Sequence, residues 1–160
     1  MAGLAHRATR LVEQDPAVVH DRVLELANRL RAEAPMIEPG SQPAMLLGTS
    51  GSLGIEVRDA GPGRIELTTT QGRIRGHVTA DIAPADGGRT NLAIAVSVEP
   101  KGMAAGLMLG AALGARPNIR QDLVTGLEEG MTDLATELAK PDGEWDAAGW
   151  QPRILADARG

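Results

Sequence analysis

The chain has 160 residues and a net charge of −5, a length that fits one domain. An acidic chain without clustered Lys and Arg is not expected to bind nucleic acid, because phosphate contacts need a basic surface. Hydrophobic residues make up 42% and charged residues 23%, which is typical of a globular protein and excludes a disordered one.

The chain contains no Cys, no Phe and no Tyr. Disulfides, thiolate nucleophiles and cysteine metal sites are therefore excluded. The core must consist of Leu, Ile, Val, Ala and Met, which either pack closely or leave space that aromatic side chains would fill. The first ten residues lack the apolar segment of a secretory signal, so we expect a cytoplasmic, bacterial protein.

A strand and a helix are predicted before residue 36. Residues 5–13 alternate loosely and indicate the strand. Asp15 and Pro16 then provide an N-cap and a proline at the first helical position. Apolar residues recur at helical spacing from about 16 to 33, and Pro35 ends the helix. The apolar stripe consists of Val19, Val23, Leu26, Ala27 and Leu30.

From residue 44 to residue 99 the period changes to two, which predicts an antiparallel meander with one apolar and one wetter face. The expected strands are 44–48, 53–60, 64–70, 73–82 and 90–99. Glycine-containing turns separate most of them. The asymmetry of the two faces fixes the register, because a shift by one residue would expose the apolar face.

Residues 102–115, GMAAGLMLGAALGA, form an uncharged run. As a helix they would be about 21 Å long, too short for a hydrocarbon core of about 30 Å, so membrane insertion is not expected. Their many glycines lower helix stability. We expect a loosely held lid, or the first half of a closing helix that continues beyond Pro117.

A second amphipathic helix is predicted after an N-cap at Asn118 and ends near Lys140. Its stripe consists of Ile119, Leu123, Leu127, Met131, Leu134 and Leu138. The tail, residues 141–160, holds Trp145 and Trp150 and is expected to be extended or partly ordered. The two amphipathic helices are the available cover for the apolar face of the sheet, so the predicted fold class is α+β.

Three stretches resemble the START/polyketide-cyclase-like superfamily, SRPBCC. Residues 15–19, DPAVV, are similar to the start of the family's first helix. Residues 81–99, closed by Pro100, are similar to its penultimate hairpin, and residues 116–139 to its closing helix. The resemblance implies the helix-grip fold, in which a curved antiparallel sheet wraps around a long C-terminal helix.

The resemblance extends over about residues 4–139 and implies a ligand-binding domain at 4–140, followed by the tail. The family usually has two short helices after the first strand, six strands in the meander and aromatic residues around its cavity. Here one longer helix and five strands are predicted, and those aromatic residues are absent.

The resemblance implies a hydrophobic small molecule or lipid-like metabolite bound between the sheet and the C-terminal helix. The residues expected to line this site are Leu67, Ile74, Gly76, Val78, Ile94, Val96, Met103, Leu107, Leu123, Leu127 and Gly130. A polyketide cyclase or dehydratase acting on an apolar substrate is the alternative. No cofactor and no metal are expected, and homodimer formation is left open.

His77 is the weak candidate for catalysis, as a general acid or base in the cavity. Its strand neighbours of like parity are Arg75 and Thr79, so a solvent-facing position is favoured. Likewise, Arg73, Arg75 and Asp81 could bind an anionic head group but more often form the solvated side of a strand.

The other histidines, His6 and His20, are expected at the surface, because they form no recognisable zinc pattern. Residues 48–54, GTSGSLG, match no nucleotide-binding loop, and no GxSxG elbow supports a serine nucleophile. Gly126 and Gly130 lie on one side of the closing helix and indicate either close packing or room for a ligand. A contact role for the tail through Trp145 and Trp150 is a third hypothesis.

Overall fold

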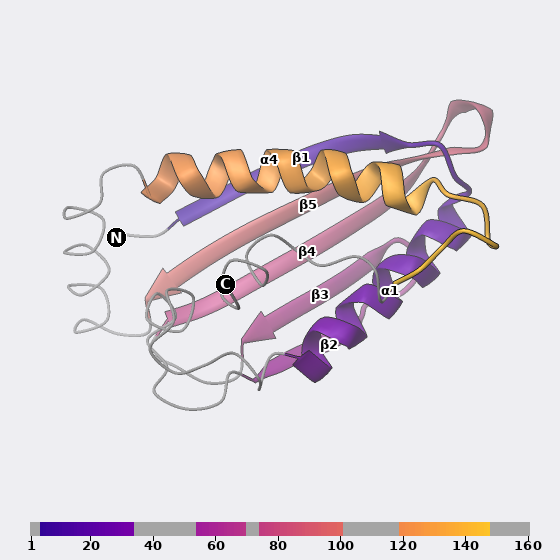
Figure 1. The fold of residues 1–160 in the computed structure, drawn as a ribbon. Helices are drawn as coiled ribbons and strands as arrows, with labels where there is room; N and C mark the ends of the chain where they lie inside the picture. Colours follow the sequence, from indigo (N-terminus) through magenta and orange to yellow (C-terminus); the bar gives the residue numbers. More distant parts are fainter. Residues whose placement is uncertain (1–3, 34–53, 70–73, 101–118, 148–160) are drawn as a thin grey trace.

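The computed structural model describes residues 4–33, 54–69, 74–100 and 119–147 (Figure 1). Its elements are β1 (Leu4–Val12), α1 (Pro16–Glu33), β2 (Ile55–Asp59), β3 (Arg64–Thr69), β4 (Ile74–Ala85), a 3-10 turn (Asp86–Gly88), β5 (Arg89–Pro100) and α4 (Ile119–Leu138). The strands and helices predicted within these ranges are confirmed, and β4 extends further toward its hairpin than expected. The predicted strand 44–48 and the run 102–115 lie outside the described residues.

The described strands form one antiparallel sheet in the order β1-β5-β4-β3-β2. Both helices lie on the same face of this sheet: α4 runs along the edge strand β1, and α1 crosses the opposite side near β2 and β3 (Figure 1). We call the face beneath the helices the inner face and the opposite one the outer face. The arrangement is the predicted α+β fold.

The inner face is apolar because alternate strand residues point toward the helices. Leu92 of β5 lies opposite Ile82 of β4, and Ile94 lies opposite Ala80. These residues join the helix stripes in one hydrophobic cluster. Its most buried large side chains are Ile65, Leu92, Met131, Leu138, Val12 and Val19.

The junction between β1 and α1 is fixed by two polar contacts. The amide of Ala17 donates to Asp15 Oδ1 at 2.9 Å, which confirms the predicted N-cap. The buried hydroxyl of Thr90 donates to the carbonyl of Gln14 at 2.7 Å. This bond ties the turn to β5, and so α1 starts from a fixed point at one end of the sheet.

The turn between β2 and β3 requires glycine. Gly63 has φ +94°, in the left-handed region, and an added Cβ would lie 2.8 Å from the carbonyl oxygen of Ile82. The amide of Ile82 donates to the Gly63 carbonyl at 2.8 Å. The close approach of these two backbones holds the turn against β4.

The outer face carries a row of ion pairs. Asp81 of β4 lies within 3.8 Å of Arg64 on β3 and within 3.9 Å of Arg7 on β1. Arg7 reaches Asp81 across β5, whose residues at these positions are Ala93 and Ala95. Small side chains on β5 thus leave room for a long one from the edge strand, and this explains why Ala93 is buried.

The first residues of the tail pack against the domain. Trp145 is half-buried against the hydrophobic cluster, and Ala147 is buried. The Trp145 indole Nε1 donates to Glu25 Oε2 at 2.9 Å. Residues 141–147 are therefore a part of the packed structure, and Trp150 lies outside the described residues.

Candidate functional site

The predicted lining residues on the strands form a strip on the inner face. The register places Leu67, Val78 and Val96 in one row across β3, β4 and β5. Gly76, Val78, Ile94 and Val96 are half-buried although both helices lie on their face of the sheet. We call these four residues the inner strip. Apolar side chains that remain accessible in this position are suited to contact an apolar ligand.

The remaining predicted lining residues divide into three groups. Leu67 is buried in the core, and Leu127 and Gly130 are half-buried on α4. Ile74 lies at the start of β4 and Leu123 within α4. Met103 and Leu107 lie outside the described residues.

Helix α4 presents a small-residue flank toward the middle of the sheet. Gly126 precedes Leu127 and Glu128 follows it, so the two lie on opposite sides of the apolar stripe. Glu128 contacts β1 at the sheet edge. The flank with Gly126 and Gly130 consequently faces away from that edge, toward the side on which α1 lies.

Apart from the adjacent residues and the backbone of the helix itself, no heavy atom of the described residues lies within 4 Å of a Cβ added at Gly126 or Gly130. Close helix–sheet packing through these glycines would require such neighbours. Between the two predicted explanations, room beside the helix is the one that this geometry supports.

We expect Gly130→Ala to raise the free energy of unfolding by about 0.5–1 kcal/mol, because alanine is favoured over glycine in a helix interior and its Cβ would meet no atom of the described residues outside the helix. The matched control is Gly63→Ala, whose Cβ would collide with the Ile82 carbonyl and should destabilise the fold. Urea unfolding of both variants measures the difference. A Gly130→Ala variant less stable than the wild type would show that the glycine is needed for packing.

His77 lies on the outer face. Its Nδ1 is 3.0 Å from Thr68 Oγ1 and its Nε2 is 3.1 Å from Thr79 Oγ1, so both ring nitrogens have hydroxyl partners. The sheet separates the imidazole from the inner strip. This geometry favours the predicted solvent-facing position over an acid or base in the cavity.

The described charged residues of β4, Arg75 and Asp81, also lie on the outer face. Asp81 has its partners in Arg64 and Arg7, and Arg75 is exposed. Surface pairs at such distances contribute little to stability. The solvated-face interpretation fits Arg75 and Asp81, whereas Arg73 lies outside the described residues.

A polar cluster that the sequence did not predict joins β1 to α4. His6 Nε2 lies 2.8 Å from Glu128 Oε1, and Arg10 Nη2 donates to Glu128 Oε2 at 2.6 Å. Arg10 also donates to the Glu128 carbonyl at 3.0 Å and, through Nε, to Thr132 Oγ1 at 3.3 Å. The hydrogen bonds from Arg10 and His6 lower the pKa of Glu128 below its ordinary value of 4.5.

The expected surface position of His20 is corrected by the structure. Its side chain is only 15% exposed, and its Nε2 lies 3.2 Å from Asp59 Oδ1. The Gly63 amide donates to His20 Nδ1 at 3.4 Å. With a partner on each nitrogen, this imidazole joins α1 to the β2–β3 turn and has a structural role.

A second unpredicted residue, Arg22, connects the two helices. The residue is 4% exposed, and its guanidinium donates to the carbonyls of Leu138, at 2.9 Å, and Lys140. It also donates to Asp142 Oδ1 at 2.8 Å and lies 4.9 Å from the centre of the Trp145 ring. The signal in the sequence was a charge on the apolar stripe of α1, one turn after Val19.

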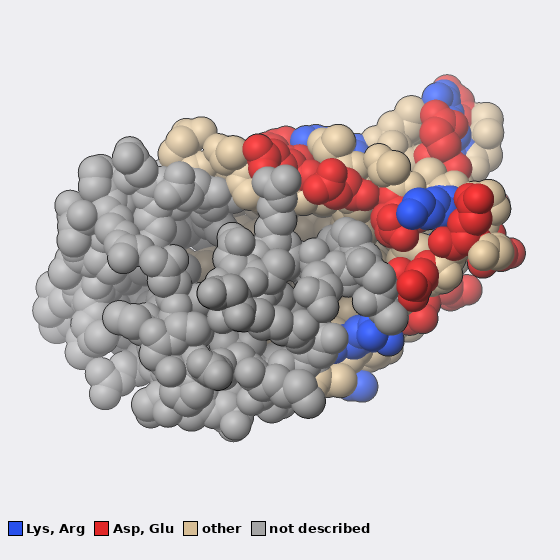
Figure 2. All heavy atoms as spheres, viewed as in Figure 1, with Lys and Arg blue, Asp and Glu red and all other residues tan. Residues whose placement is uncertain are grey.

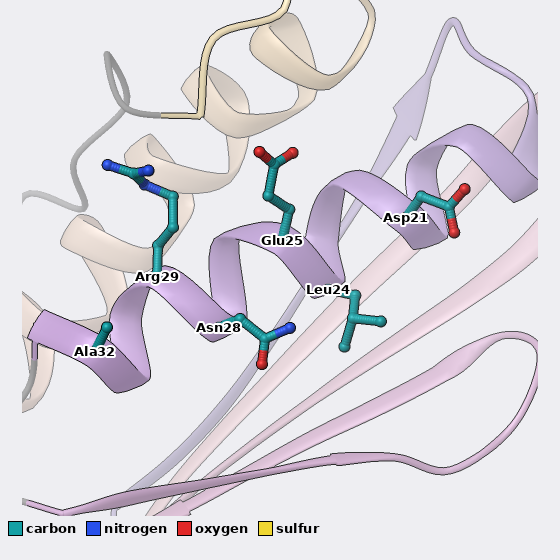
Figure 3. A pocket seen from close by; sticks show the side chains of 6 residues that line it. All are labelled: Asp21, Leu24, Glu25, Asn28, Arg29 and Ala32. Carbon is teal, nitrogen blue, oxygen red and sulfur yellow. The ribbon is translucent and has the colours of Figure 1, made fainter.

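A pocket of about 480 Å³ opens on α1, separate from the inner strip. It is lined by Asp21, Leu24, Glu25, Asn28, Arg29 and Ala32, all on this helix (Figure 3). Glu25 and Arg29 project in the same direction, one turn apart. Four of the six lining residues, Asp21, Glu25, Asn28 and Arg29, have polar side chains, and Glu25 already accepts a hydrogen bond from Trp145.

Acidic side chains gather over α4 and at the end of the molecule that carries the β4–β5 hairpin (Figure 2). Within residues 4–33, 54–69, 74–100 and 119–147, no group of three or more His, Asp or Glu is arranged to hold a metal ion. In those same ranges, no helix is both long enough and apolar enough to cross a membrane.

The chain is similar to solved structures of other proteins. Protein CV1439 from Chromobacterium violaceum matches with a TM-score of 0.50 and 16% identity, over 86% of this chain and 99% of that one. TTHA0849 from Thermus thermophilus matches with a TM-score of 0.48 and 16% identity, over 84% and 96% of the two chains. Ara h 8.0201 matches with a TM-score of 0.48 and 9% identity, over 86% and 96%.

No protein-family model matches the chain, and no curated protein matches it by sequence. The similarity to CV1439 extends over nearly all of that structure and concerns the fold. Sheet order, helix placement and this comparison agree on an α+β helix-grip architecture, the fold that the resemblance to the SRPBCC superfamily implies.

Proposed function

We propose that this protein binds or carries a hydrophobic small molecule or lipid-like metabolite between the sheet and α4. The observation that carries the proposal is the half-buried, wholly apolar inner strip beside a helix flank whose glycines meet no described atom. Contact with apolar ligand surface would contribute roughly 25 cal/mol per Å² removed from water. The helix-grip architecture is consistent with a ligand site in this place.

The alternative of a polyketide cyclase or dehydratase needs a group on the inner face that moves protons. His77, the residue considered for this role, has its imidazole on the outer face between two threonine hydroxyls. The residues of the inner strip have no ionisable side chain, and the ionisable groups beside it on the inner face, His6, Arg10 and Glu128, are bonded to one another. Binding without chemistry is therefore the function that the described residues support better.

The test is a titration with a fluorescent fatty-acid analogue, together with native mass spectrometry of freshly purified protein. We expect Val96→Asn, on the inner strip, to weaken the Kd about tenfold, because the amide loses water without gaining a partner. Ala95→Asn, one residue earlier and on the outer face, is the matched control and should change the Kd less than about twofold.

Circular dichroism of both variants separates loss of binding from loss of folding. Protein that carries no small molecule and binds no apolar probe would contradict the proposed function. If Val96→Asn and Ala95→Asn are both folded and lose the same affinity, the ligand does not bind at the inner strip.

A further inference from the structure

The two halves of α4 are held in different ways. In its C-terminal half Met131, Leu134 and Leu138 are buried in the core, and Arg22 binds the carbonyls at its end. Among the described side chains that precede Glu128 on this helix, none is buried. A helix segment with few buried apolar contacts opens more readily than one with many.

The polar cluster of His6, Arg10 and Glu128 lies at the boundary between these halves. Both carboxylate oxygens of Glu128 are bonded to β1, one by each of the other two residues. The backbone carbonyl of Glu128 also accepts from Arg10. Charge-assisted bonds of this length are among the stronger polar contacts in proteins, so the cluster is well placed to fix the N-terminal half of α4.

The same cluster adjoins the inner strip. His6 lies opposite Val96 in the sheet register and so extends the row of Leu67, Val78 and Val96 to the edge strand. Leu127, next to Glu128 on α4, is half-buried against the core on the same side as the strip. Because Val96 is the neighbour of His6 on β5, movement of α4 away from β1 would widen the space beside Val96.

We propose that His6, Arg10 and Glu128 form a releasable clasp, which keeps the N-terminal half of α4 on the sheet and thereby controls access to the inner strip. This proposal depends on the proposed function only for the ligand that would enter when the clasp opens. The opening itself is a property of the protein without ligand, and it can be measured in the absence of any probe.

The test is amide hydrogen exchange of α4 in Glu128→Ala. We expect the protection factors of residues 124–130 to fall about tenfold, the scale of losing hydrogen bonds to a charged group, while those of 131–138 stay within about twofold. The matched control is Glu137→Ala, which also removes a carboxylate from a cation pair, but one formed with Lys140 at the end of the same helix. An equal change along the whole helix, or no change in 124–130, would overturn the clasp.

A second measurement keeps the test valid if Glu128→Ala does not fold. Among the described residues, the titratable groups that pair with the Glu128 carboxylate are His6 and Arg10 on β1. These groups hold the pKa of Glu128 in the folded protein below 4.5. The stabilisation that the ionised carboxylate provides is therefore complete above that pH, and it is lost as the pH falls through the pKa of the folded state. Protection of 124–130 in the wild type should therefore drop before that of 131–138 on acidification, and simultaneous loss of both would contradict the clasp.

Stopped-flow binding of the fluorescent fatty-acid analogue links the clasp to the proposed function. We expect Glu128→Ala to raise the association rate several-fold relative to Glu137→Ala, because the open state is more populated. Absence of probe binding in every variant would contradict the proposed function and leave the exchange result to decide the clasp. Unchanged association in a variant that does bind, and whose residues 124–130 have lost protection, would reject control of access.

Discussion

Replacement of Arg22 by methionine is expected to lower the free energy of unfolding by about 3 kcal/mol, or Tm by roughly 6–12 °C, because it removes the donors for two backbone carbonyls at the end of α4. The last carbonyls of a helix have no partner within the helix, and here the guanidinium supplies one. Methionine retains the length and the apolar contact of the arginine stem but offers no hydrogen bond.

The matched control is Arg29→Met on the same helix, where the arginine is exposed. We expect a change below about 0.5 kcal/mol there. Urea unfolding followed by circular dichroism measures both variants, and Trp145 fluorescence reports the junction directly because its ring lies 4.9 Å from the Arg22 guanidinium carbon. Equal stability of the two variants would show that Arg22 is dispensable to the junction.

Truncation of Leu92 to alanine is expected to lower the free energy of unfolding by about 3 kcal/mol. Leu92 is 0% exposed at the centre of the hydrophobic cluster, between Ile82 of β4 and Arg10 of β1 in the register. A core without Phe or Tyr has few large side chains that could move into the cavity, so the loss should be close to the full value for a buried leucine.

The same substitution at Leu11 is the control. Leu11 also lies in a strand, but its side chain is 44% exposed on β1, and we expect its truncation to cost less than about 1 kcal/mol. Guanidinium unfolding measures the free energy of unfolding of both variants, and the two values are directly comparable because the substitution is the same. A difference below about 1 kcal/mol would mean that the core around Leu92 collapses into the space.

Periodicity was sufficient to predict the elements but not their polar connections. The alternation in β4 and β5 reveals the buried face because that pattern is local, and the stripe of α4 does the same at helical spacing. Arg22 could have been singled out, since a charge on the apolar stripe of α1 must find partners. His6 and Arg10 likewise share the parity of the buried Val12.

Their common partner, Glu128, could not be predicted from such patterns. It is 122 residues from His6 and 118 from Arg10, and one of several acidic residues that the stripe of α4 leaves at its side. Its role follows only from the placement of α4 on β1. For the same reason His20 was expected at the surface, because its partner Asp59 is the last residue of β2, a strand whose position against α1 no local pattern encodes.

The position of β1 has a consequence for the order of folding. This strand is made early in synthesis, yet its neighbours in the sheet and above it are β5 and α4, which come last. Its pairing with β5 therefore closes the loop between Val12 and Thr90, a step that is entropically costly and slows folding. On the ribosome, β2 to β5 can form a meander from adjacent segments. Strand β1 gains all of its partners only after α4, which ends at Leu138, has been synthesised.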